Sequence, residues 1–207
     1  MELVWLAAGW LTYGVLHSVL ASFAVKDRVA RHWPAAAPWY RLGFNVVATI
    51  TALPLAWLIY AIPGEPLWRW SGVWWWLANG LALAAIAGFL VSTRAYDMDE
   101  FLGLRQIREH DRATADREGF TLSFFHRFVR HPWYCFGLVI VWTRDMNAAW
   151  LVSAIAITLY FAIGSWFEER KLIAIHGDAY RRYREMVPAL LPLPWKYLSA
   201  EEARNWR

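Results

Sequence analysis

Apolar residues of the chain are grouped in blocks, most of them about 20 residues long, the length at which a helix crosses the core of a bilayer. Three blocks precede residue 94, and two more follow residue 132. The pattern predicts an all-α, polytopic membrane protein with five transmembrane helices. The expected spans are about Leu3–Val25, Trp39–Ile62, Trp74–Thr93, Trp133–Thr143 and Ala148–Phe167.

The fourth and fifth blocks are separated only by the polar sequence Arg144-Asp145-Met146-Asn147. Such a short polar connection predicts a tight turn between two antiparallel helices. We therefore expect spans four and five to form a helical hairpin. The fourth block is shorter than a bilayer core, so it is expected to tilt or to start below the headgroups.

Basic residues predict the orientation of these spans. Of the 21 Lys and Arg residues, all but Arg69 and Arg144 fall in segments that five spans would place on one side. Cytoplasmic loops carry the excess of Lys and Arg. We therefore expect a protein of the bacterial inner membrane with its N-terminus outside and its C-terminus in the cytoplasm.

Composition supports a membrane protein and excludes several other classes. Charged residues make up 18% of the chain, against about 25% in soluble domains, and there are 16 Trp residues, a type enriched at membrane interfaces. The single cysteine, Cys135, excludes an internal disulfide, and no metal-ligand spacing is present. The net charge of +4 follows the topology, so no nucleic-acid partner is expected.

The cytoplasmic segment 96–130 is longer than a connection needs. It mixes charges with apolar residues, which predicts interfacial helices. The apolar positions are Phe101, Leu102, Leu104, Phe120, Leu122, Phe124, Phe125 and Phe128. Further on, Asp178 is expected to cap a short helix, and Ser199 with Glu202 matches a capping box. We interpret residues 1–207 as one membrane domain, with spans one to three in 1–95 and the catalytic core in 96–207.

The first candidate for chemistry is the sequence Arg130-His131-Pro132-Trp133-Tyr134 at the start of the fourth span. Pro132 suits the first turn of a helix, whose free N–H groups and dipole favour an anionic group. Arg130 and His131 add donors at the same place. The alternative is that Arg130 is an ordinary cytoplasmic anchor and His131 an incidental cap.

The second candidate is the pair Glu168-Glu169 at the cytoplasmic end of the fifth span. Adjacent carboxylates on a helix project about 100° apart, so one can face the bundle and the other water. The predicted hairpin brings this pair close to Arg130 and His131. The alternative is a salt-bridge patch with Arg170 and Lys171. Among weaker candidates, His17, Asn45 and Asn79 are expected to form hydrogen bonds between helices.

At these residues the sequence resembles the isoprenylcysteine carboxyl methyltransferase-like superfamily of membrane methyltransferases. Further motifs narrow the resemblance to a bacterial branch with methanethiol S-methyltransferases and membrane proteins associated with denitrification. The family usually has glycine two residues after the motif tyrosine, where this chain has Phe136 followed by Gly137. The motifs are Arg130–Tyr134, Glu168-Glu169, His176–Tyr183, Val187-Pro188, Leu191-Pro192, His17–Ala21, Phe101–Gln106 and Trp142-Thr143.

The resemblance implies a methyltransferase that uses S-adenosylmethionine and acts on a small thiol or a lipophilic acceptor at the membrane surface. It implies Arg130 and Glu168 as catalytic residues. The residues expected at the cofactor are Gln106, His131, Tyr134, Gly137, Glu169 and Tyr180. Two alternatives remain at this point: an NADPH-dependent membrane reductase of the sterol-reductase type, and a non-catalytic accessory protein. The sequence leaves the acceptor and the oligomeric state open.

Overall fold

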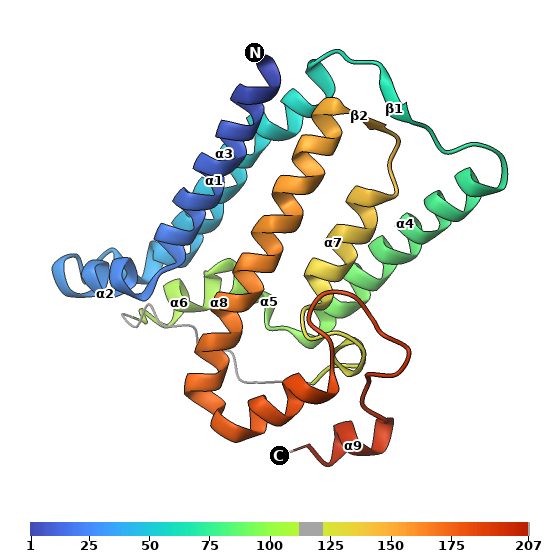
Figure 1. Ribbon diagram of the computed structural model, residues 1–207. Helices are drawn as coiled ribbons and strands as arrows, with labels where there is room; N and C mark the ends of the chain where they lie inside the picture. Colours follow the sequence, from blue (N-terminus) through green and yellow to red (C-terminus); the bar gives the residue numbers. More distant parts are fainter. Residues whose placement is uncertain (112–121, 207) are drawn as a thin grey trace. The chain divides into compact units, whose positions relative to one another are not determined.

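The computed structural model describes residues 1–111 and 122–206, and these are predominantly helical (Figure 1). They form two compact units, each built from three stretches of chain. The first unit holds residues 1–67, 96–111 and 146–156. The second holds residues 68–95, 122–145 and 157–206. Helix α8 begins in the first unit and continues into the second.

Four helices are long and apolar enough to cross a membrane: α1 (Glu2–Ala21), α3 (Tyr40–Ala61), α4 (Gly72–Ser92) and α8 (Ala148–Met186). A fifth apolar helix, α7 (Pro132–Trp142), has 11 residues. At about 1.5 Å per residue it extends roughly 16 Å, about half of a bilayer core. Many large apolar side chains of α1, α3 and α4 are exposed, as expected for helices that face lipid.

In the first unit, α1 packs along α3 around a core of Leu6, Leu55 and Ile62. Gly9 makes the close approach possible, because a Cβ there would lie 2.7 Å from Leu55 Cδ2. Helix α1 ends at Ala21, earlier than the predicted end of the first span. Ser22 has an extended backbone, and its side chain accepts a hydrogen bond from the Val25 N–H, which starts α2 (Phe23–His32).

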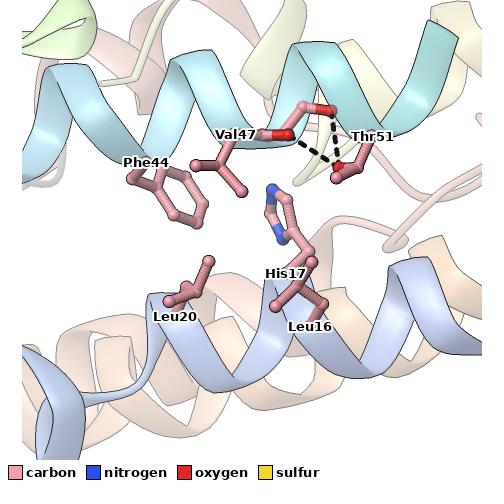
Figure 2. Close-up of a pocket in the computed structure, with 7 residues that line it drawn as sticks. Leu16, His17, Leu20, Phe44, Val47 and Thr51 are labelled. Carbon is pink, nitrogen blue, oxygen red and sulfur yellow. Dashed lines mark hydrogen bonds between the residues drawn. The ribbon is translucent and has the colours of Figure 1, made fainter.

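His17 extends from α1 toward α3 into a small apolar pocket (Figure 2). Its ring centroid lies 4.7 Å from that of Phe44. On the facing helix, the Thr51 hydroxyl donates to the carbonyl of Val47 at 2.7 Å, so it is bonded within its own helix. The contacts of His17 with Phe44 and Tyr13 are aromatic. An interhelical hydrogen bond from His17 stays a prediction.

Two short helices, α5 (Met98–Leu102) and α6 (Leu104–Arg108), follow α4 in the chain and belong to the first unit. Gly103 separates them with φ of +90°, and a Cβ there would lie 2.6 Å from the Leu42 nitrogen. Arg41 Nε and Asn45 Nδ2 both donate to the carbonyl of Phe101, at 3.0 and 2.9 Å. The predicted interhelical role of Asn45 is thus confirmed. The predicted interfacial residue Phe120 lies outside the described residues.

In the second unit, α4 packs against α7. Trp133 Nε1 donates to Ser92 Oγ at 2.8 Å at one end of this pair. Phe136, which stands where the family usually has glycine, packs against Gly88. A Cβ on Gly88 would lie 2.8 Å from the Phe136 ring. The bulk of Phe136 is therefore accommodated by a glycine on the neighbouring helix.

The connection after α7 differs from the predicted tight turn. Residues Met146–Asn147 form a strand, β2, which pairs with β1 (Pro66–Trp68) in a two-stranded sheet. Asn79, expected to bond between helices, instead accepts from Arg144 of this connection at 3.2 Å. The described part of the chain is therefore helical with one short sheet, where the sequence predicted helices alone.

Helix α8 continues past Phe167, where the fifth span was expected to end, to Met186. Gly177 interrupts it with φ of +57° and ψ of −130°, a conformation that favours glycine. The predicted short helix at Asp178 is therefore the last part of α8. The final helix, α9 (Ala200–Arg204), begins with the predicted capping box of Ser199 and Glu202, which is confirmed.

Candidate functional site

The site is built in the second unit, where the residues before α7 meet the end of α8. Pro132 occupies the first turn of α7, as its missing N–H allows. The backbone N–H groups of Arg130 and His131 donate to the carbonyls of Pro188 and Ala189, at 2.9 and 3.1 Å. The segment after α8 therefore fixes the position of both side chains.

Glu169 is the buried centre of the cluster. Its Oε1 accepts from Nε and Nη2 of Arg130, both at 2.7 Å, and lies 3.2 Å from His131 Nε2. Its Oε2 lies 3.0 Å from Nε of Arg184. The predicted meeting of Arg130 and His131 with Glu169 is therefore present in the structure.

Arg130 directs all three guanidinium nitrogens at acceptors of the protein. Besides the two bonds to Glu169, its Nη1 donates to the backbone carbonyls of Arg184 and Val187. Its side chain is only 9% exposed. Arg130 thus joins the start of α7, the end of α8 and the chain that follows α8.

Glu168 points to a different environment from its neighbour. Its side chain is 48% exposed, and its Oε2 lies 3.4 Å from His131 Nδ1. The Tyr134 hydroxyl donates to the same oxygen at 3.3 Å. The two adjacent carboxylates are therefore divided as predicted, with one buried and one facing solvent.

His131 lies between the two carboxylates. Burial by itself lowers the pKa of His131, but the hydrogen bonds to Glu168 and Glu169, with their negative charges, outweigh it and raise the pKa above 6.5. This favours the doubly protonated ring, in which both nitrogens donate.

Three rings are stacked beside the carboxylates. The Tyr134 ring lies between His131 and Phe161, with centroid distances of 5.4 and 4.6 Å and interplanar angles of 14° and 11°. Gly137 permits this stack, because a Cβ there would lie 2.9 Å from Phe161 Cε2. Sequence reasoning missed Phe161. Phe161 lies seven residues before Glu168, and this spacing, which places Phe161 and Glu168 on one face of a helix, could have indicated it.

Of the remaining predicted site residues, Tyr180 lies near the cluster, where burial and the charge of Glu169 raise the pKa of its hydroxyl. Tyr180 is 1% exposed and packs with Tyr183, Val187 and Leu198 in the core of the C-terminal segment. Gln106 belongs to the first unit, where its Nε2 donates to the Glu100 carbonyl at 3.1 Å. Cofactor contacts from Tyr180 and Gln106 stay predictions.

His126 adds a second, half-buried imidazole near this cluster. Burial, and to a lesser extent the charge of His131, lower the pKa of His126 from 6.5 to about 4. Ser123 N–H donates to its Nδ1 at 3.3 Å, so this nitrogen is an acceptor and the ring is neutral. The backbone carbonyl of His126 accepts from the Tyr183 hydroxyl at 2.6 Å, which ties this segment to α8.

The chemistry of the donor set suits an organic cation. No group of three or more His, Cys, Asp or Glu residues that would hold a metal ion occurs in residues 1–111 and 122–206. The partly exposed carboxylate of Glu168 does match a cationic ligand, because opposite charges attract. Cys135 is buried and is no part of this set.

Comparison with curated proteins identifies relatives along most of the chain. Methanethiol S-methyltransferase 2 of Bradyrhizobium diazoefficiens is 34% identical over 182 residues, which cover 87% of this chain and 69% of the relative. Methanethiol S-methyltransferase of Mycobacterium tuberculosis is 33% identical, with coverage of 89% and 76%. The protein of the same name from Crocosphaera subtropica is 28% identical, with coverage of 87% and 71%. No family model and no solved structure matches the chain.

Proposed function

Because the chain belongs to the family of the methanethiol S-methyltransferases, we propose that it transfers a methyl group to the sulfur of a small thiol at the membrane surface. Methanethiol is the proposed acceptor, and S-adenosylmethionine the proposed donor. The observation that carries the proposal is the division of Glu168 and Glu169 around His131 and Tyr134, with one carboxylate buried and the other exposed.

The exposed side of the cluster fits a sulfonium donor. The half-exposed Glu168 carboxylate would hold the positive charge, since an anion stabilises a cation, and the Tyr134 hydroxyl would orient that carboxylate. When bound, S-adenosylmethionine supplies an electrophilic methyl group on sulfur. The apolar residues of α7 beside these groups suit a small, weakly polar acceptor.

Each protein group then has a defined part. Arg130 was expected as a catalytic residue and Glu169 as a cofactor contact. In this proposal both are positioning residues, because they are bonded to each other and Arg130 is bonded to the backbone. As the thiol sulfur forms its bond to the methyl carbon, the bond from that carbon to the donor sulfur would break, S-adenosylhomocysteine would leave, and the thiol proton would pass to the carboxylate of Glu168. His131 holds that carboxylate in place through Nδ1. Orientation of the two reactants is worth several kcal/mol in such a displacement.

We propose five membrane spans, with α7 as the short fourth span in a hairpin with α8. The N-terminus then lies outside and the C-terminus in the cytoplasm of a bacterium. Residues 1–207 form one membrane domain in this proposal, with the catalytic core in 96–207. Reporter fusions after α9 and in the loop at Pro63 are expected on opposite sides. A periplasmic signal from the fusion after α9 would refute the orientation.

The reaction is tested with the purified protein in lipid nanodiscs and methyl-labelled S-adenosylmethionine. Methanethiol, longer thiols, prenylated thiols and lipid amines are offered as acceptors, and labelled product is measured. We expect label on methanethiol. Glu168→Gln is expected to reduce turnover at least tenfold, whereas Glu201→Gln, an exposed control on α9, leaves it unchanged.

The outcomes separate the proposal from other functions. Label only on lipid amines would contradict thiol methylation. Failure to bind S-adenosylmethionine in calorimetry would contradict the methyltransferase and favour a non-catalytic accessory protein. Binding of NADPH instead would favour a membrane reductase.

A further inference from the structure

Exposed aromatic side chains of the second unit gather next to the segment that precedes α7. The side chains of Phe124 and Tyr197 are 62% and 52% exposed. Phe128 lies between them, with its ring centroid 5.5 Å from that of Phe124 and 6.2 Å from that of Tyr197. The guanidinium carbon of Arg127 lies 5.6 Å and 5.3 Å from the ring centroids of Phe124 and Phe128. These four residues, from two distant segments of the chain, form one continuous surface, which we call the aromatic surface.

Hydrogen bonds hold the two segments together. The Leu198 N–H donates to the Arg127 carbonyl at 2.9 Å, and Arg127 Nε donates to the Leu198 carbonyl at 3.0 Å. The Lys196 N–H donates to the carbonyl of Leu193 at 3.0 Å and closes a tight turn, within which Trp195 is exposed. The aromatic surface is therefore fixed by the fold, and the turn with Trp195 directly precedes its last residue.

The aromatic surface lies at the level at which helix α4 ends. The Phe125 ring packs edge-on against the ring of Phe136 of α7, with 5.1 Å between the centroids. Phe136 in turn packs against Gly88, which lies four residues, or roughly 6 Å, before Ser92, the last residue of α4. Because α4 is long enough to cross a membrane, Phe125 and the adjacent ring of Phe124 lie at the border of the bilayer.

We propose that the aromatic surface lies in the headgroup layer of the membrane and binds anionic phospholipid there. Tyr and Trp are enriched in this layer, and the exposed Phe124 ring would reach the acyl chains. Arg127 supplies the complementary charge, because a guanidinium stacked on aromatic rings keeps its planar fork for phosphate oxygens. Among residues 1–111 and 122–206, no carboxylate forms an ion pair with Arg127.

Position and charge both favour lipid as the occupant of this surface. The surface lies beside the end of a helix of spanning length, where lipid headgroups surround a membrane protein. Lys196, exposed on the adjacent turn, adds a second positive charge that attracts anionic lipid. None of these residues belongs to the cluster around Glu169, so the proposal is independent of the proposed reaction.

The test measures the depth of the surface with a nitroxide label in lipid nanodiscs. The label is attached at Trp195→Cys in a Cys135→Ala background, since Cys135 is the single cysteine of the chain. Oxygen relaxes a label in lipid, and a water-soluble nickel chelate relaxes a label in water. We expect the label at Trp195→Cys to be relaxed mainly by oxygen. The matched control is a label at Glu201→Cys on α9, expected to be relaxed mainly by the chelate.

The lipid composition tests the role of charge. In nanodiscs with phosphatidylglycerol, the ratio of immobilised to mobile label is expected to be about fivefold higher than in phosphatidylcholine alone, as one arginine near an anionic surface provides. Arg127→Gln is expected to remove this difference. Arg127→Lys keeps the charge and is expected to retain it, whereas Phe124→Ser should move the label toward water in both lipids.

The contrary outcomes are distinct. A label at Trp195→Cys that the chelate relaxes as strongly as the label at Glu201→Cys would overturn the proposal. A label that neither reagent reaches would show that protein, such as a second copy of the chain, covers the surface instead. Equal loss of the lipid difference in Arg127→Lys and Arg127→Gln would show that Arg127 only holds Leu198, and would refute recognition by charge.

Discussion

Replacement of Glu169 by glutamine is the most informative single change in the cluster. The variant keeps the shape of the side chain but replaces one carboxylate oxygen by an NH2 group. The wild-type carboxylate accepts two bonds of 2.7 Å from Arg130 and lies 3.0 Å from Arg184 Nε. The remaining amide oxygen can still accept from Arg130, but the NH2 group cannot accept from Arg184 and the negative charge is lost. The variant therefore leaves the buried Arg130 charge without its anionic partner.

The magnitude follows from burial. The side chains of Arg130 and Glu169 are 9% and 6% exposed, and breaking such a buried pair costs about 3–5 kcal/mol. Arg184 is 43% exposed, so its contribution is below about 1 kcal/mol. Glu168→Gln is the control of equal chemistry, and since its side chain is 48% exposed we expect less than about 1 kcal/mol from it.

The assay is equilibrium unfolding in detergent micelles, followed by tryptophan fluorescence, with a thermal scan in parallel. A loss of about 3 kcal/mol corresponds to roughly 6–12 °C in melting temperature for a protein of this length. Equal losses in Glu169→Gln and Glu168→Gln would refute the assignment of Glu169 as the buried centre of the site.

Three further outcomes are expected. Gly137→Ala brings a methyl group to 2.9 Å from Phe161 and is expected to lower the free energy of unfolding by about 1–3 kcal/mol in the same assay. The double variant with Phe161→Leu is expected to recover most of this loss. At Gly103, φ is +90° and a Cβ would lie 2.6 Å from the Leu42 nitrogen, so Gly103→Ala is expected to lower the free energy of unfolding by more than about 2 kcal/mol in the same assay. Gly43→Ala is the control, because a Cβ at Gly43 meets open space. The pKa of His126 is lowered from 6.5 to about 4, so as the pH falls the unfolded chain takes up this proton before the folded protein does. The contribution of His126 to the free energy of unfolding is therefore fully present above pH 6.5 and is lost as the pH falls toward 4. His126→Gln should flatten this part of the stability profile, and an unchanged slope would contradict the assignment.

The sequence predicted the helices of spanning length well because their apolar blocks are long and uniform. The limits of α3 and α4 lie within two residues of those expected. The errors fall where a local side-chain contact decides the boundary. Ser22 ends α1 early by capping α2, and nothing in the apolar pattern at this position indicates a break. Beyond Phe167, good helix formers such as Glu168–Leu172 carry α8 past the point where hydropathy falls.

The site was predicted in part for a similar reason. Arg130, His131 and the two glutamates stand out as polar residues beside apolar helices, and the structure brings them together. Arg184 and Phe161 did not stand out. Arg184 belongs to a segment rich in arginine, and its contact with Glu169 depends on the backbone conformation at Gly177. Phe161 is one aromatic residue among many in an apolar helix. Its role follows only from the stack with Tyr134.

The backbone bonds of Arg130 and His131 to Pro188 and Ala189 also have a consequence for the order in which the protein matures in the cell. A growing chain meets the membrane from its N-terminus onward, so the apolar helices insert before residues 187–198 have left the ribosome. Until then, Arg130 lacks the carbonyl acceptors that these residues supply. The cluster around Arg130 is therefore completed late, and translation stopped before Pro188 would release a protein that has its apolar helices but lacks the complete proposed site.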